Sequence, residues 1–72
     1  MKEKVLLGKI GNKIKQLRSE KGFSQQEMAA ELDYEKSNMS RLESGRVNPK
    51  ISTLYKVAQV LKVSLAELLD IE

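Results

Sequence analysis

The chain has 72 residues, of which 40% are hydrophobic and 32% charged, and it contains neither cysteine nor histidine. This composition predicts one small globular domain over residues 1–72 and excludes disulfides, thiolate metal sites and chemistry that depends on histidine. No apolar run approaches the roughly 20 residues of a membrane span and no signal peptide is evident, so we expect a cytoplasmic protein.

The net charge of +3 is spread unevenly along the chain. Residues 1–22 carry seven basic and two acidic side chains (+5), residues 24–45 carry two and five (−3), and residues 46–72 carry four and three (+1). A surplus of this size is typical of a solvated surface as well as of nucleic-acid binding. We therefore expect the lysines of the first segment either to be solvated or to attract phosphate.

The first predicted helix covers about residues 3–20. Its apolar side chains, which recur at three- and four-residue steps, are Val5, Leu6, Ile10, Ile14 and Leu17. Gly8 and Gly11 weaken its first half, and Gly22 is a natural left-handed end after it.

The second predicted helix covers about residues 24–32. It begins with "SQQE", a capping box in which the Ser24 hydroxyl accepts from the backbone N–H of Glu27 and the Glu27 carboxylate accepts from that of Ser24. Asp33 follows, and aspartate tolerates a left-handed turn better than most residues.

The third predicted helix covers about residues 36–44 and has one thin apolar edge, Met39 and Leu42. Its other face is rich in hydrogen-bond donors, which are Lys36, Ser37, Asn38, Ser40 and Arg41. Gly45 ends this helix, and Pro49 biases the residue before it away from helical geometry.

Two further helices complete the chain, at about residues 51–62 and 64–70. The fourth has a wide apolar face formed by Ile51, Leu54, Tyr55, Val57, Ala58 and Leu61, and the fifth begins with a second capping box, "SLAE", at Ser64. No strand pattern, repeat or linker interrupts the sequence. We therefore predict an all-α protein, a compact five-helix bundle.

The second and third helices are separated by three or four residues, as in a helix-turn-helix. Ala29 lies where the two helices must approach closely, and a small residue there permits a steep crossing that leaves one face of the third helix free. In a DNA-binding protein such a helix enters the major groove, where lysine and arginine donate to guanine and serine serves several bases.

Residues 14–69 resemble the lambda-repressor/Cro-like helix-turn-helix family, also called XRE-type regulators. The motifs that carry the resemblance are "LRSEKGFSQQEMA", "MSRLESG" and, after a proline, "TLYKVAQVLKVSLAELL". Each is weak alone, but together, in this order and at these spacings, they are specific. The resemblance implies a sequence-specific regulator of transcription that binds double-stranded DNA, most often a repressor, in the nucleoid of a prokaryote or on phage DNA.

The resemblance also implies a role for each matching position. The expected base contacts are Lys36, Ser37, Ser40 and Arg41. The expected DNA phosphate contacts are Gln25, Asn38, Ser44, Arg46, Asn48 and Lys50. Arg18 and Glu43 match a pair that forms a buried salt bridge between the first and third helices in some members. Arg41 has a rival role, an intrahelical ion pair with Glu35 or Glu43.

Three positions depart from the family pattern. Asp33 stands where glycine is common, Glu35 replaces the usual serine or threonine cap of the third helix, and Lys50 replaces the usual serine cap of the fourth. Glu27 and Glu31 lie nearby, so the helix-turn-helix is net negative. We therefore expect binding to depend on a few specific contacts, with long-range attraction from the first helix and from the loop at residues 46–50.

One recognition helix specifies too few base pairs for a unique genomic address, and readers of this fold commonly bind as two-fold dimers. We therefore expect a homodimer on a pseudo-palindromic operator. The apolar side chains of the fifth helix either finish the core or form the dimer interface. They are Leu65, Leu68, Leu69 and Ile71.

The alternative function is an antitoxin, or another protein-binding module that sequesters a small partner protein, with DNA binding secondary. A copurifying second chain would favour it. An enzyme is not expected, because the chain lacks histidine, cysteine and an evident cluster of carboxylates. We expect no cofactor, metal, membrane or small-molecule ligand.

Overall fold

The structure is a computed structural model that describes residues 2–71. Its elements, in chain order, are α1 (Glu3–Glu20), α2 (Gln25–Glu31), α3 (Lys36–Glu43), α4 (Ile51–Leu61) and α5 (Leu65–Leu68). The predicted all-α, five-helix architecture is confirmed, and every helix begins within one residue of its expected start. The fifth helix is shorter than predicted, because it ends at Leu68 rather than near residue 70.

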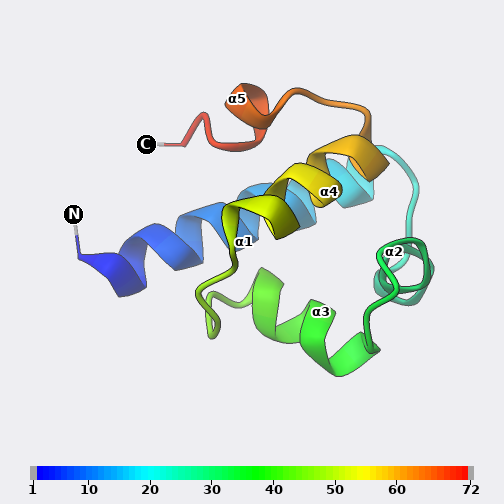
Figure 1. The fold of residues 1–72 in the computed structure, drawn as a ribbon, viewed down its shortest axis with the longest axis horizontal. Helices are drawn as coiled ribbons and strands as arrows, with labels where there is room; N and C mark the ends of the chain where they lie inside the picture. Colours follow the sequence, from blue (N-terminus) through cyan, green and yellow to red (C-terminus); the bar gives the residue numbers. More distant parts are fainter. Residues whose placement is uncertain (1, 72) are drawn as a thin grey trace.

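The helices are arranged around α1, which runs along the molecule with α4 beside it (Figure 1). α2 and α3 pack against each other on one side of this pair, and α5 lies on the opposite side. The described part of the chain measures 31 × 24 × 21 Å. Within residues 2–71, no helix combines the length and the apolar character needed to cross a membrane.

All five helices contribute an apolar edge to one core. Its fully buried side chains are Ile14, Met28, Met39, Val57, Leu61 and Leu68. The helical spacing placed Val5, Leu6, Ile51 and Tyr55 on the apolar faces of their helices. The expectation that these faces pack against the core is wrong at these four positions, because all four side chains are exposed. Spacing identifies a helix face, but it does not say how far along the helix other elements cover that face.

Glycine brings α1 into backbone contact with the end of α3. A Cβ atom on Gly11 would lie 2.5 Å from the carbonyl oxygens of both Leu42 and Glu43. A Cβ atom on Gly45 would lie 2.7 Å from the Cα atom of Gly8, and Gly45 ends α3 with a φ of 75°, as predicted. The glycines therefore set the distance between the two helices.

The residues at the predicted turns and caps adopt the expected conformations and hydrogen bonds. Asp33 adopts the left-handed conformation between α2 and α3, with a φ of 56°. The capping box of α2 is complete: Ser24 Oγ accepts from Glu27 N at 3.0 Å, and Glu27 Oε1 accepts from Ser24 N at 2.8 Å. At α5, Ser64 Oγ accepts from Glu67 N at 3.0 Å, which is one half of the second predicted box.

Candidate nucleic-acid interface

α3 exposes its polar face while burying its apolar edge. Met39 is 0% and Leu42 is 2% exposed, so this edge belongs to the core. Every expected base contact is exposed to solvent, and these residues are Lys36, Ser37, Ser40 and Arg41. The helix therefore offers accessible donors of the kinds that bind base edges.

Arg41 is positioned by a neighbour on its own helix. Its Nη1 atom donates to Oδ1 of Asn38 at 3.2 Å. The rival ion pair with Glu43 does not form, because the Glu43 carboxylate is bound by Arg18. The contact uses the carbonyl oxygen of Asn38 and leaves its NH₂ group able to donate to a phosphate.

Arg18 and Glu43 form an ion pair between α1 and α3. Arg18 Nε lies 2.6 Å from Glu43 Oε2, and the two side chains are only 11% and 3% exposed. A second bond runs from Arg18 Nη2 to Glu43 Oε1 at 3.1 Å, and Arg18 Nη1 donates to the carbonyl of Phe23 at 2.8 Å. These hydrogen bonds supply partners for the polar groups of the pair, which a buried ion pair needs in order to keep its geometry.

The same carboxylate also holds Gln25, an expected phosphate contact at the start of α2. Gln25 Nε2 donates to Glu43 Oε1 at 3.0 Å. One amide hydrogen is used in this bond, and the second remains available to an outside acceptor. Glu43 therefore links α1, α2 and α3 and orients a side chain at their common edge.

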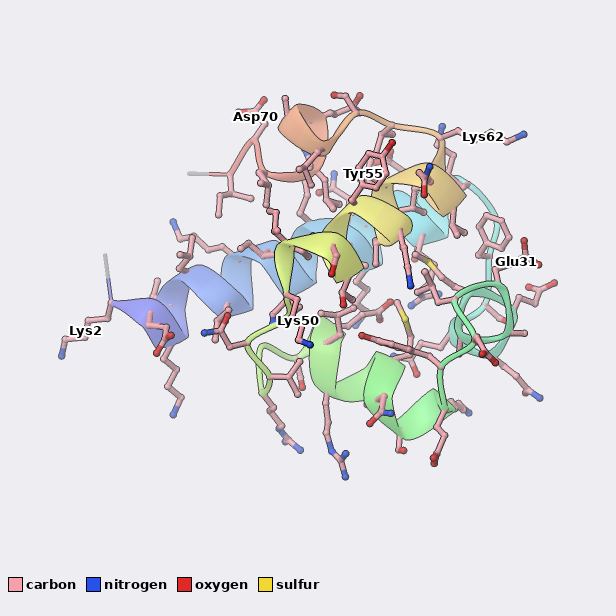
Figure 2. The ribbon with its side chains drawn as sticks, viewed as in Figure 1. Lys2, Glu31, Lys50, Tyr55, Lys62 and Asp70 are labelled. Atoms are coloured by element: carbon pink, nitrogen blue, oxygen red, sulfur yellow. The ribbon has the colours of Figure 1, made fainter. Side chains whose placement is uncertain are left out.

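The loop after α3 carries the remaining expected phosphate contacts, Ser44, Arg46, Asn48 and Lys50, all of which are exposed. Ser44 Oγ donates to the carbonyl of Arg41 at 3.1 Å. Asn48 Nδ2 donates to Glu3 Oε1 at 2.9 Å, which ties the loop to the first turn of α1. Figure 2 shows Lys50 where α4 begins, next to α3, and Lys62 and Asp70 on the far side of the molecule.

The expected phosphate contacts line three hollows beside α3, one of which is shared by Ser44, Arg46 and Asn48. Gln25 and Ser44 line a second hollow. Asn38, Asn48 and Lys50 line the third. On α3, Ser40 lines the hollow of Gln25 and Asn38 lines the hollow of Lys50, and these two positions point about 200° apart around the helix. Gln25 and Lys50 therefore lie on different sides of the exposed face of α3.

Two side chains at this surface were not identified from the sequence. Glu3 binds Asn48, and no sequence signal relates residues 45 positions apart. Lys15 is exposed and lines the hollow of Gln25 and Ser44. Its position was detectable in principle, since it lies three residues before Arg18 and hence on the same face of α1.

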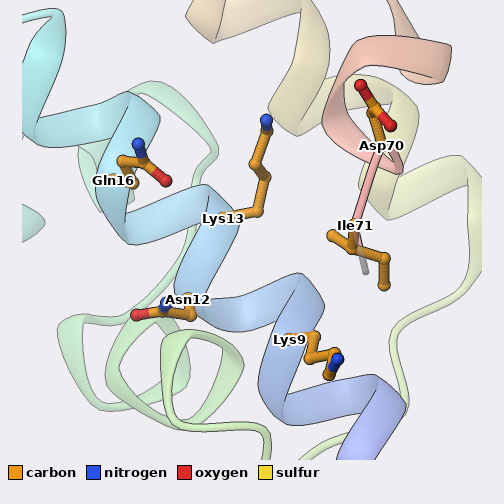
Figure 3. A pocket seen from close by; sticks show the side chains of 6 residues that line it. All are labelled: Lys9, Asn12, Lys13, Gln16, Asp70 and Ile71. Carbon is orange, nitrogen blue, oxygen red and sulfur yellow. The ribbon is translucent and has the colours of Figure 1, made fainter.

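Another hollow lies between α1 and the segment after α5 (Figure 3). Its lining consists of Lys9, Asn12, Lys13, Gln16, Asp70 and Ile71. It mixes basic and acidic groups, and it includes none of the residues expected to contact DNA.

The side chains expected at a dimer interface divide between two environments. Leu68 is fully buried, so it finishes the core. Leu65, Leu69 and Ile71 are half-buried and pack against the edge of that core. Of the four side chains expected at the interface, only these three retain surface that a second molecule can cover.

Known proteins are similar to this chain in sequence and in fold. A family model described as "Helix-turn-helix domain" matches residues 11–71. The chain is 44% identical over 59 residues to the uncharacterized HTH-type transcriptional regulator y4dJ of Sinorhizobium fredii, and the match covers 82% of this chain and 77% of that protein. It is 47% identical over 62 residues to the HTH-type transcriptional regulator SinR of Bacillus subtilis, which covers 85% of this chain. The chain spans only 56% of SinR.

Solved structures agree with this relationship. The crystal structure of SinR in complex with DNA has a TM-score of 0.77 and 47% identity, covering 85% of this chain and 98% of that one. A SinR protein/SinI protein complex gives a TM-score of 0.78, covering 85% and 60%. The restriction-modification controller protein C.AhdI of Aeromonas hydrophila has a TM-score of 0.82 and 31% identity, covering 86% and 94%.

Proposed function

The chain belongs to the XRE-type, Cro/C1-like helix-turn-helix family of DNA-binding transcriptional regulators, and on this premise we propose that it is a repressor that binds double-stranded DNA as a homodimer. It acts in the cytoplasm, where its DNA target lies. One observation carries the proposal: α3 buries its apolar edge and exposes a face of hydrogen-bond donors.

α3 is the recognition helix of this proposal and enters the major groove. Its eight residues are about 12 Å long, and the major groove is about 12 Å wide. Lys36 and Arg41 donate to guanine O6 and N7, and Ser37 and Ser40 bind bases beside them. The solved complex of SinR with DNA, from a relative of 47% identity, supports this use of the fold.

The two phosphate-binding groups hold α3 in register. Gln25 and Ser44 bind the backbone on one side of the groove. Asn38, Asn48 and Lys50 bind it on the other, and Arg46 extends this contact along the loop. Phosphate contacts of this kind determine orientation, and the base contacts of α3 supply specificity.

Dimerisation supplies the length of sequence that one helix cannot specify. We propose an interface at α5 and the segment after it, where Leu65, Leu69 and Ile71 keep exposed surface. A two-fold dimer predicts a pseudo-palindrome whose half-sites are about 34 Å, or one helical turn, apart. Sedimentation of the free protein and of Leu69→Glu tests this part, because the variant should remain monomeric.

Selection from a random duplex library at about physiological salt tests the function as a whole, since this salt suppresses nonspecific binding. A recovered pseudo-palindrome with one-turn spacing is the expected result. Absence of enrichment, with circular dichroism showing a folded helical protein, would refute DNA reading by α3. A reporter gene placed behind the recovered operator then distinguishes repression from activation.

A protein partner is the second candidate. The SinR protein/SinI protein complex supports it, as do four exposed apolar side chains, Val5, Leu6, Ile51 and Tyr55. In this alternative the chain is an antitoxin-like module that sequesters a small protein. Copurification of a second chain at fixed stoichiometry, with no duplex enriched, would favour it.

A further inference from the structure

Lys15 lies on the face of α1 that meets α3. Three residues at helical spacing define this face: Gly11, which touches the carbonyl groups at the end of α3, then Lys15, then Arg18, which pairs with Glu43. Lys15 therefore stands between a backbone contact and an ion pair, both made to α3. Its exposed side chain lines the same hollow as Gln25, Ser40 and Ser44.

The hollow contains one carboxylate, Glu43, whose charge is already matched. Both of its oxygens accept from Arg18, and one also accepts from Gln25. Within residues 2–71, Arg18–Glu43 is the only ion pair, so the Lys15 ammonium is not held by a carboxylate of this part of the chain. An unpaired ammonium beside the spare amide hydrogen of Gln25 is a pair of donors suited to one phosphate group.

The other lysines of α1 do not share this position. Lys9 and Lys13 line the hollow on the side of the segment after α5, together with Asp70 (Figure 3). They carry the same charge on the same helix but do not line the hollow of Gln25. Lys4, nearer the start of α1, lines a different hollow at the loop after α3, together with Ser44, Arg46 and Asn48. Among the lysines of α1, Lys15 is the one that lines the hollow of Gln25.

We infer that Lys15 binds the same DNA phosphate as Gln25, as a contact that α1 contributes to one wall of the major groove. This inference rests on the proposed function. Lys15 then binds DNA at a defined position, in addition to the general attraction of the basic α1 for phosphates. The Arg18–Glu43–Gln25 network beneath it holds the amide partner in place.

The test compares Lys15→Ala with Lys9→Ala, which removes the same charge from the same helix. The probes are the duplex recovered by selection and a mixed-sequence duplex of about three turns, each titrated over a range of salt. Lys15→Ala should weaken binding to both duplexes about fivefold and lower the salt slope by about 1, and Lys15→Arg should restore most of the loss. Lys9→Ala should weaken binding less than twofold. Both variants should keep the wild-type melting temperature, because Lys15 is exposed and the half-buried Lys9 does not belong to the core.

A double-mutant cycle with Gln25→Ala tests the shared phosphate. The combined loss should be smaller than the product of the single losses, because either variant alone already disrupts the same contact. Independent losses, or equal losses for Lys15→Ala and Lys9→Ala, would overturn the inference while leaving the proposed function intact. Failure of the wild-type protein to bind either duplex would refute the proposed function itself.

Discussion

Gln25 donates to Glu43 across 3.0 Å, and this bond joins a proposed phosphate contact to the most buried acidic group of the described chain. Glu43 is in turn held by Arg18 from α1. The scaffold and the interface therefore share one carboxylate. Substitutions at either end of this network should affect stability and binding to different extents.

Arg18→Ala should be strongly destabilising. It leaves the Glu43 carboxylate buried without its cation, and removal of one partner of a buried pair costs about 3–5 kcal/mol. Urea unfolding followed by circular dichroism measures this loss. The matched double variant Arg18→Met with Glu43→Leu should unfold at higher urea than Arg18→Ala, because no buried charge remains. If the double variant were no more stable than Arg18→Ala, the unpaired Glu43 carboxylate would not be the cause of the loss.

Gly11→Ala and Gly8→Ala make the same chemical change one turn apart and should have opposite effects. A Cβ atom on Gly11 would meet two carbonyl oxygens of α3 at 2.5 Å, so we expect a loss of about 1–3 kcal/mol. A Cβ atom on Gly8 meets nothing within 4 Å, so the higher helix propensity of alanine should add about 0.5–1 kcal/mol. Thermal unfolding of the two variants measures the difference. Equal gains for both would contradict the close approach of α1 to α3.

Arg41→Ala should cost about 1–3 kcal/mol of binding free energy on the selected operator and relax the preference at one base pair. Its guanidinium is exposed and oriented by Asn38. Competition with a set of single-base-pair operator variants identifies the affected position. An equal loss on every duplex would assign Arg41 to the phosphates.

Lys50→Ala should behave differently, because Lys50 belongs to the loop and not to the recognition helix. Binding to the operator and to mixed-sequence DNA should weaken by the same factor, and the salt slope should fall by about 1. Fluorescence anisotropy over a range of salt measures both quantities. Lys62→Ala, on the far side of the molecule, is the charge-matched control (Figure 2). An unchanged slope for Lys50→Ala would remove this residue from the contacts.

The capping box of α2 should make stability depend on pH. Hydrogen bonds from the backbone and the hydroxyl of Ser24 lower the pKa of Glu27 below its usual 4.5. A lowered pKa in the folded state means that the carboxylate stabilises the protein above about pH 4.5 and loses this effect as the pH falls through the folded-state pKa. Glu27→Gln should therefore be less stable than the wild type at about pH 7, and the difference should narrow at about pH 3. A difference independent of pH would exclude the ionised carboxylate as its source.

Local chemistry made most of the fold predictable. The Ser24 capping box, the left-handed Asp33 and the glycine after α3 act within a few residues, and their sequence signals matched the structure. The contacts of Gln25 with Glu43 and of Asn48 with Glu3 join distant segments. A single sequence gives no signal for such pairs, because they depend on how the helices are packed. The same limit applies to Ile51 and Tyr55, which the helical spacing placed on an apolar face, whereas both lie at the surface.

The division of α3 into a buried edge and an exposed face also bears on how related regulators diverge. Met39 and Leu42 hold the helix in the core, and none of the expected base contacts is buried. Exposed substitutions usually change stability by less than about 0.5 kcal/mol. Under the proposed function, a duplicated copy of this protein can therefore acquire a new operator through changes on that face without first acquiring compensating mutations in the core. The residues proposed to choose the DNA target are therefore different from the residues that keep the protein folded.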